Sequence, residues 1–98
     1  MTKEWPFEDP TNVTTITTVH VLENKLPILY VYHDQDDGMW QFLCGTTNEP
    51  DDGRVVGLGC MFDKDPSIGE LADLPLGWYA WRNSPTEPWH REINTESE

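Results

Sequence analysis

The sequence predicts one α+β domain, in which an antiparallel sheet of four to five strands is accompanied by two short helices. The length of 98 residues is that of a single domain. Several segments alternate apolar and polar side chains with the period of a half-buried strand. An Asp-Pro pair at residues 65 and 66 is a typical helix start. Residues 1–12 and 91–98, which are rich in acids and other polar side chains, are expected to be extended or loosely ordered tails.

The first elements are expected to be a strand and a helix. Residues 13–16 are β-branched and rich in threonine, which favours a strand. Thr17 or Thr18 is a suitable N-cap for a short helix that extends to Glu23. A hydroxyl oxygen there can accept a hydrogen bond from the first unpaired backbone amides of the helix.

A β-hairpin follows. Residues 27–33 and 39–44 have the composition of strands, and the connecting residues 34–38 end in Asp-Gly. Loops of this length and ending are typical of hairpins. In the second strand, alternation turns Trp40 and Phe42 toward the same face. We therefore expect both rings to be buried.

The second half of the chain is expected to add two strands, a helix and a last extended piece. Residues 54–58 predict a short buried strand, and residues 77–82 predict another, in which aromatic side chains occur on both faces. The helix that starts at Asp65 is expected to end at Pro75. A turn bounded by prolines then leads to an extended piece at Trp89.

The charge of the chain limits the class of partner. It has 18 Asp and Glu against 6 Lys and Arg, a formal net charge of −12. Such a field repels nucleic acid and anionic lipid, and it attracts basic protein surfaces. The N-terminus has no signal-peptide pattern, and the longest apolar run, around residues 27–32, is too short to span a bilayer. We therefore expect a cytoplasmic domain that binds neither nucleic acid nor membrane.

The acids between residues 34 and 52 form two groups in predicted loops, and no Lys or Arg separates them. They are Asp34, Asp36, Asp37, Glu49, Asp51 and Asp52. If both loops close the same end of the sheet, they form one negative pole that suits a cationic partner. The alternative is two solvated turns, in which Asp is an ordinary turn residue. The five aspartates are candidate partner-binding residues.

The segment 77–91 gathers the residue types that dominate protein interfaces, namely Trp, Tyr and Arg. Tyr79, Arg82 and Trp89 are its candidate partner-binding residues. The alternative is that most of its rings pack inward and that Arg82 stacks on one of them. In that case, Tyr79 or Trp89 is the ring that stays open to a partner.

A metal or cofactor site is not expected. The three histidines, two cysteines and many acids include no CxxC, no HxxxH and no zinc-finger spacing. The loop Asp34-Gln35-Asp36-Asp37-Gly38 is not a calcium loop, because its glycine comes one place early. Position 45 is moreover glycine, where such a loop requires a bidentate Glu.

Catalytic signatures are also absent from the sequence. There is no GxSxG elbow, and the two glycines at residues 57 and 59 lack the lysine of a phosphate loop. Cys44 and Cys60 lie in apolar stretches, so both are expected to be buried, reduced thiols. We expect a protein without enzymatic activity. The alternative is a small enzyme, or a metal-binding or small-molecule-binding protein, that uses His33 with a nearby acid or thiol.

Two stretches, PILYVYHDQDDGMWQF and DPSIGELADLPLGWYAWR followed by PWHRE, resemble a small family of acidic bacterial proteins that are grouped with the immunity proteins of polymorphic toxin systems. The resemblance extends from Trp5 to Arg91, and residues 57–62 fit it less well. It implies an α+β fold and binding to a toxin, and it assigns no catalytic or binding residues. Together with the charge, it predicts a protein-binding domain for a basic partner that is itself a monomer or a weak dimer.

Overall fold

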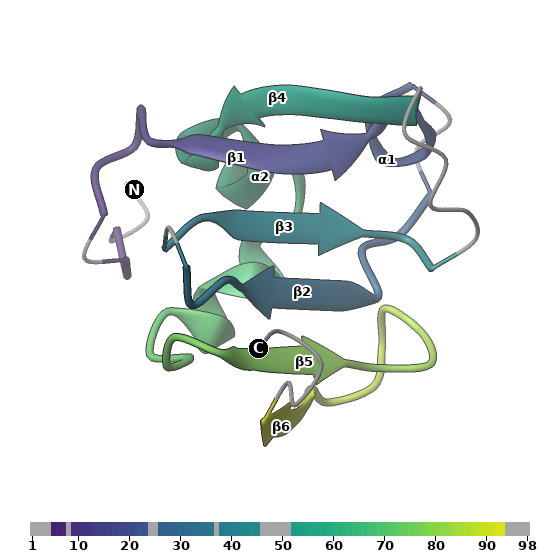
Figure 1. Ribbon diagram of the computed structural model, residues 1–98. Coiled ribbons are helices and arrows are strands. Elements are labelled where there is room, and N and C mark those ends of the chain that lie inside the picture. Colours follow the sequence, from purple (N-terminus) through teal and green to yellow (C-terminus); the bar gives the residue numbers. More distant parts are fainter. Residues whose placement is uncertain (1–4, 8, 24–25, 37, 46–51, 94–98) are drawn as a thin grey trace.

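Six strands form one mixed sheet in the computed structural model, which describes residues 5–7, 9–23, 26–36, 38–45 and 52–93. The strand order is β4-β1-β3-β2-β5-β6 (Figure 1). The strands are β1 (Thr14–Thr18), β2 (Tyr30–His33), β3 (Trp40–Leu43), β4 (Gly53–Gly57), β5 (Trp78–Trp81) and β6 (His90–Ile93). The helices are α1 (Val19–Leu22), α2 (Leu58–Lys64) and the 3₁₀-helix η2 (Pro66–Leu71). The α+β class is thus confirmed.

The predicted sheet of four to five antiparallel strands is only roughly right. The sheet has six strands, and β1 runs parallel to β3, with Thr15 opposite Trp40 and Ile16 opposite Gln41. Local patterns show that a segment forms a strand, but they do not show which strand it pairs with or in which direction. Strand β6 was not separated from the expected extended piece because its sequence, His-Arg-Glu-Ile, has no apolar alternation.

The predicted hairpin is confirmed. Strands β2 and β3 pair antiparallel, with His33 opposite Trp40. The loop is closed by a hydrogen bond from the Asp34 amide to the Met39 carbonyl, 2.9 Å long. Gly38 takes a φ of 73° there, a left-handed conformation that glycine adopts without strain. Both Trp40 and Phe42 are buried, as expected.

Of the helices α1, α2 and η2, the first and the last lie where the sequence places a helix. Thr18 is the N-cap residue of α1, but its side chain makes no capping hydrogen bond. The start of η2 is confirmed, because the Asp65 carboxylate accepts a hydrogen bond from the Ser67 amide at 3.1 Å. This helix is of the 3₁₀ type and ends at Leu71 rather than at Pro75. Residues after it form turns before β5.

Helix α2 was missed, because residue 58 was expected to end a strand. Gly59 inside the helix disfavours it, and Gly57 at the N-cap has no side chain that could accept a capping hydrogen bond. Met61 and Phe62 nevertheless follow Leu58 by three and four residues, about one helical turn, and all three are buried. Burial of this apolar face stabilises a helix that the local propensity does not favour.

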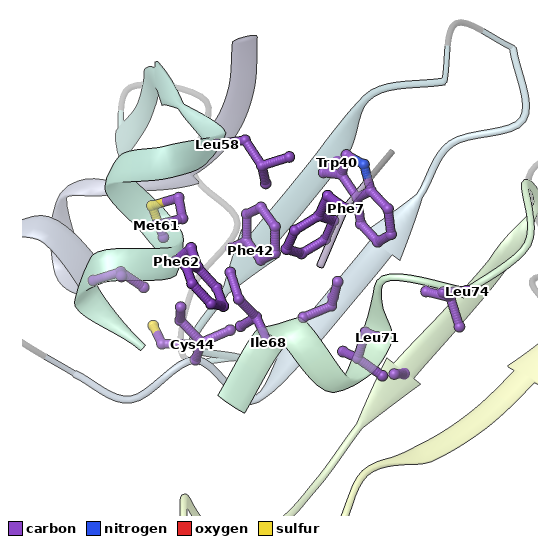
Figure 2. Close-up of a cluster of buried hydrophobic side chains, with 14 residues drawn as sticks. Phe7, Trp40, Phe42, Cys44, Leu58, Met61, Phe62, Ile68, Leu71 and Leu74 are labelled. Carbon is purple, nitrogen blue, oxygen red and sulfur yellow. The ribbon is translucent and has the colours of Figure 1, made fainter. Parts of the chain in front are cut away.

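The core lies between the sheet and the two helices α2 and η2, which cover one of its faces (Figures 1 and 2). Phe42 of β3 points into it between Leu58 of α2 and Ile68 of η2 in Figure 2. Phe7 is also buried, and its ring meets those of Trp40 and Phe62 edge to face. The N-terminal residues 5–7 are therefore part of the packed domain.

Candidate functional site

Arg82 is an internal residue, which corrects its predicted role in partner binding. Its side chain is only 2% exposed, and its Nη2 donates to the Asp65 carboxylate at 2.9 Å and to the Ile28 carbonyl at 3.0 Å. The guanidinium lies 4.0 Å from the centre of a ring of Trp89. A guanidinium has five donors that need partners when it is buried, and this structure supplies them from inside. The alternative expectation, Arg82 stacked on a ring, is therefore the one found.

The two other candidates from this segment are both half-buried but differ in their surroundings. Trp89 is half-buried, and its indole Nε1 donates to the Ser67 carbonyl at 3.2 Å. Its ring is thus divided between the core and solvent. Tyr79 lies on the face of the sheet opposite the helices, where its hydroxyl donates to Glu92 at 3.3 Å. Of the three, Tyr79 is the residue best placed to meet a partner.

The described candidate aspartates lie at two ends of the sheet. Asp34 and Asp36 lie at the hairpin, beyond the Trp40 end of β3, whereas Asp52 precedes β4 at the opposite end of the sheet (Figure 1). Asp34 and Asp36 are therefore separated from Asp52 by the length of β3. Asp52 also pairs with His20, whose Nε2 is 3.0 Å from its carboxylate. Asp37, Glu49 and Asp51 lie outside the described residues.

The structure brings together a different set of residues on the face of the sheet that is turned away from α2 and η2. None of the described helices covers this face (Figure 1). We call it the open face. In β2 and β5, the residues that alternate with the buried Val31 and Ala80 belong to it. They are Tyr30, Tyr32, Tyr79 and Trp81, and all four are half-buried.

The first row of the open face crosses four strands in register. Gln41 of β3 is opposite Tyr32, Tyr32 is opposite Tyr79, and Tyr79 is opposite Glu92. The two tyrosine rings stack with their centroids 5.3 Å apart and their planes 14° apart. Asp34 joins this row, because its carboxylate accepts a hydrogen bond of 2.7 Å from the Gln41 side chain. A pair of stacked rings thus lies between two carboxylates, and we call these five residues the tyrosine row.

A second row of the open face is more apolar. Leu43, Tyr30, Trp81 and His90 are opposite one another in successive strands. The rings of Trp81 and His90 stack at 4.5 Å. In β4, the strand at the opposite edge of the sheet from β6, the side chain of Val55 is 70% exposed. The open face therefore combines aromatic surface with exposed aliphatic surface.

The described lysine and arginine residues all lie on the helix-covered side of the sheet. Arg82 and Arg91 contact residues in or beside η2. Lys64 lies in α2. Arg54 of β4 is in register with the buried Thr17. Charges on the described open face are therefore those of carboxylates, together with the ionisable ring of His90.

His33, the residue on which the enzyme alternative depends, contacts the core. Its ring stacks on Trp40 at 3.9 Å, and its Nδ1 is 2.7 Å from the Leu74 carbonyl oxygen. In the described part of the chain, no three His, Cys, Asp or Glu side chains are grouped as a metal site. No helix there has the length and apolarity that crossing a membrane requires.

The two cysteine thiols lie in different environments. Cys44 is buried, as expected, but Cys60 is exposed, which corrects the expectation for that residue. Helix α2 turns Leu58 and Met61 inward, and the helical period then places residue 60 on the outer side.

Sequence reasoning identified Tyr79 and Asp34 but missed the rest of the open face. The alternation of β2, in which Val31 lies between Tyr30 and Tyr32, was a usable signal that one face carries both tyrosines. Which rings then meet across the sheet depends on strand order and register, which no local pattern specifies.

Comparison of the chain with protein-family models, with curated proteins and with solved structures found no match. The resemblance to immunity proteins therefore stays a prediction, and the open face itself is the basis for a functional proposal.

Proposed function

We propose that this chain is a non-enzymatic protein-binding domain that captures a partner with a basic surface on its open face. The observation that carries the proposal is the tyrosine row, in which two stacked rings lie between the carboxylates of Asp34 and Glu92. If the partner is a toxin, such capture is how an immunity protein acts.

Electrostatics supports this choice of partner. The formal net charge of −12 draws basic surfaces toward the molecule, which raises the rate of encounter more than it strengthens the final contact. The described Lys and Arg residues lie on the helix-covered side. A basic surface that approaches the open face therefore meets carboxylates and no described Lys or Arg.

The aromatic surface supports binding as well. Tyr and Trp are enriched among the residues that contribute most to protein interfaces. Here Tyr30, Tyr32, Tyr79 and Trp81 lie on neighbouring strands β2 and β5 and are half-buried in the free domain. A sheet holds such rings in place before binding, so little side-chain entropy is lost when a partner covers them.

Neutralising the two carboxylates of the tyrosine row should slow the capture of a basic probe. We expect the double variant Asp34→Asn, Glu92→Gln to associate more slowly with an immobilised octapeptide of alternating lysine and arginine. The loss should shrink at high salt, because the Debye length falls from about 10 Å at 0.1 M to about 3 Å at 1 M. Surface plasmon resonance measures the association rate.

The matched control removes the same two charges from the helix side. Asp63 of α2 and Glu70 of η2 are exposed there, and the variant Asp63→Asn, Glu70→Gln has the same net charge as the first. The control should associate nearly as fast as the unaltered domain. Equal slowing of both variants would show that net charge alone acts and would refute binding at the open face.

The aromatic surface should control dissociation instead. We expect Trp81→Ala to raise the dissociation rate of the same octapeptide by about fivefold, because a cation over its half-buried indole contributes about 1 kcal/mol. The effect should depend little on salt. Leu76→Ala, which removes an exposed apolar side chain outside the two rows, is the control. A dissociation rate that changes as much in the control would contradict a specific role for Trp81.

A further inference from the structure

We propose that the tyrosine row recognises an arginine side chain of the partner. This inference rests on the proposed function and goes further, because it names the chemical group that is bound. The site consists of the stacked rings of Tyr32 and Tyr79, with Asp34 and Gln41 on one side and Glu92 on the other.

The geometry presents a ring face next to a carboxylate on each side of the stack. The rings of Tyr32 and Tyr79 stack across neighbouring strands. The outer face of Tyr32 is therefore turned toward β3, where Gln41 binds the Asp34 carboxylate at 2.7 Å. The outer face of Tyr79 is turned toward β6, where its hydroxyl meets Glu92. In the proposed complex, a flat cation stacks on one of these faces and donates hydrogen bonds to the adjacent carboxylate.

Guanidinium fits this arrangement better than ammonium does. It is planar, stacks on aromatic rings and is more weakly hydrated, and its fork of donors matches a carboxylate. An ammonium group is a compact, strongly hydrated point charge that loses more hydration against a ring. Of the two basic side chains that a protein partner offers, the tyrosine row therefore favours arginine.

The same chain already binds one of its own arginines with an aromatic ring and a carboxylate. Arg82 lies 4.0 Å from the centre of a ring of Trp89, and its Nη2 donates to the Asp65 carboxylate at 2.9 Å. That contact is internal and lies on the helix side of the sheet. The tyrosine row repeats the combination of ring face and carboxylate at the surface, where the described structure places no arginine or lysine.

A titration with three matched peptides tests the proposal. Each is a short glycine-spaced peptide with two arginines, two lysines or two citrullines, and the protein is the full chain labelled with ¹⁵N. We expect the arginine peptide to shift the amide signals of Tyr32, Tyr79 and Glu92. It should bind about threefold more tightly than the lysine peptide. The citrulline peptide keeps the shape but has no charge, so it should bind most weakly.

Variants at one position separate the ring from the charge. Tyr79→Phe keeps the ring face and should keep the preference for arginine, whereas Tyr79→Leu keeps apolar area without the ring and should remove it. Glu92→Gln should weaken the arginine and lysine peptides together. Asp63→Asn, on the helix side, is the control of equal charge and should change the ratio of their affinities by less than twofold.

The outcomes distinguish the two proposals. Equal binding of arginine and lysine peptides at the open face would overturn the arginine proposal and leave the proposed function standing. Shifts confined to α2 and η2 would overturn the assignment of the binding site for both. If the lysine and arginine peptides both fail to shift any signal of the open face, both proposals are wrong.

Discussion

Replacing Arg82 with Ala should lower the free energy of unfolding by about 3 kcal/mol. The change leaves the Asp65 carboxylate without its ion pair, the Ile28 carbonyl without its donor and the inner face of Trp89 without its cation. Loss of one partner from a buried pair typically costs about 3 to 5 kcal/mol. The low end applies because the Asp65 side chain is 23% exposed. Water can therefore solvate part of the remaining charge.

Urea denaturation measures this loss as a lower midpoint with an unchanged slope. Arg91→Ala is the matched control, because Arg91 also pairs with an aspartate, Asp73, at 2.8 Å. Asp73 is 79% exposed, and exposed pairs contribute about 0 to 1 kcal/mol. If the two variants lose similar stability, the buried contacts of Arg82 do not stabilise the packing of β5 against η2 more than an exposed ion pair would.

Replacing Phe42 with Ala should destabilise the domain by about 3 to 5 kcal/mol. The ring lies fully buried between the sheet and the helices α2 and η2. Its removal loses apolar burial and leaves a cavity that close-packed neighbours fill only in part. Domains of this size have a total stability of about 5 to 15 kcal/mol, so the variant should be marginally folded at room temperature.

Leu43→Ala is the control for this second change. Leu43 is the next residue of β3, and it lies half-buried on the open face. Partial burial of a leucine side chain is worth about 1 kcal/mol, so the midpoint of thermal unfolding should fall much less than in Phe42→Ala. Comparable losses would mean that the two faces of β3 are equally buried, which would remove the distinction between core and open face.

The sequence by itself determined the features that depend on neighbouring residues. The hairpin follows from two strand-forming segments and a loop that ends in Asp-Gly. The start of η2 follows from Asp65, which accepts from the Ser67 amide, and from Pro66, which has no amide to satisfy. Burial of Trp40 and Phe42 follows from strand alternation. Each of these signals acts over a few residues, so it can be read without the rest of the chain.

Some positions of the candidate site were predictable and others were not. Tyr79 was named because Trp, Tyr and Arg gather around it in the sequence, but the same reasoning placed Arg82 at the surface. A long charged side chain is usually exposed, and only the tertiary contacts to Asp65 and Trp89 make its burial favourable. The separation of Asp34 from Asp52 could have been inferred, because the predicted strand 39–44 lies between them.

Only the tertiary structure decided how the elements combine. Strand β1 pairs in parallel with β3, and helix α2 forms despite its glycines because the core buries Leu58, Met61 and Phe62. The tyrosine row likewise exists only once β3, β2, β5 and β6 are aligned in register. Pairing between strands that are distant in the chain depends on total burial and on contacts across the whole sheet. A local sequence pattern records neither of these, so the site could be recognised only after the strands were in place.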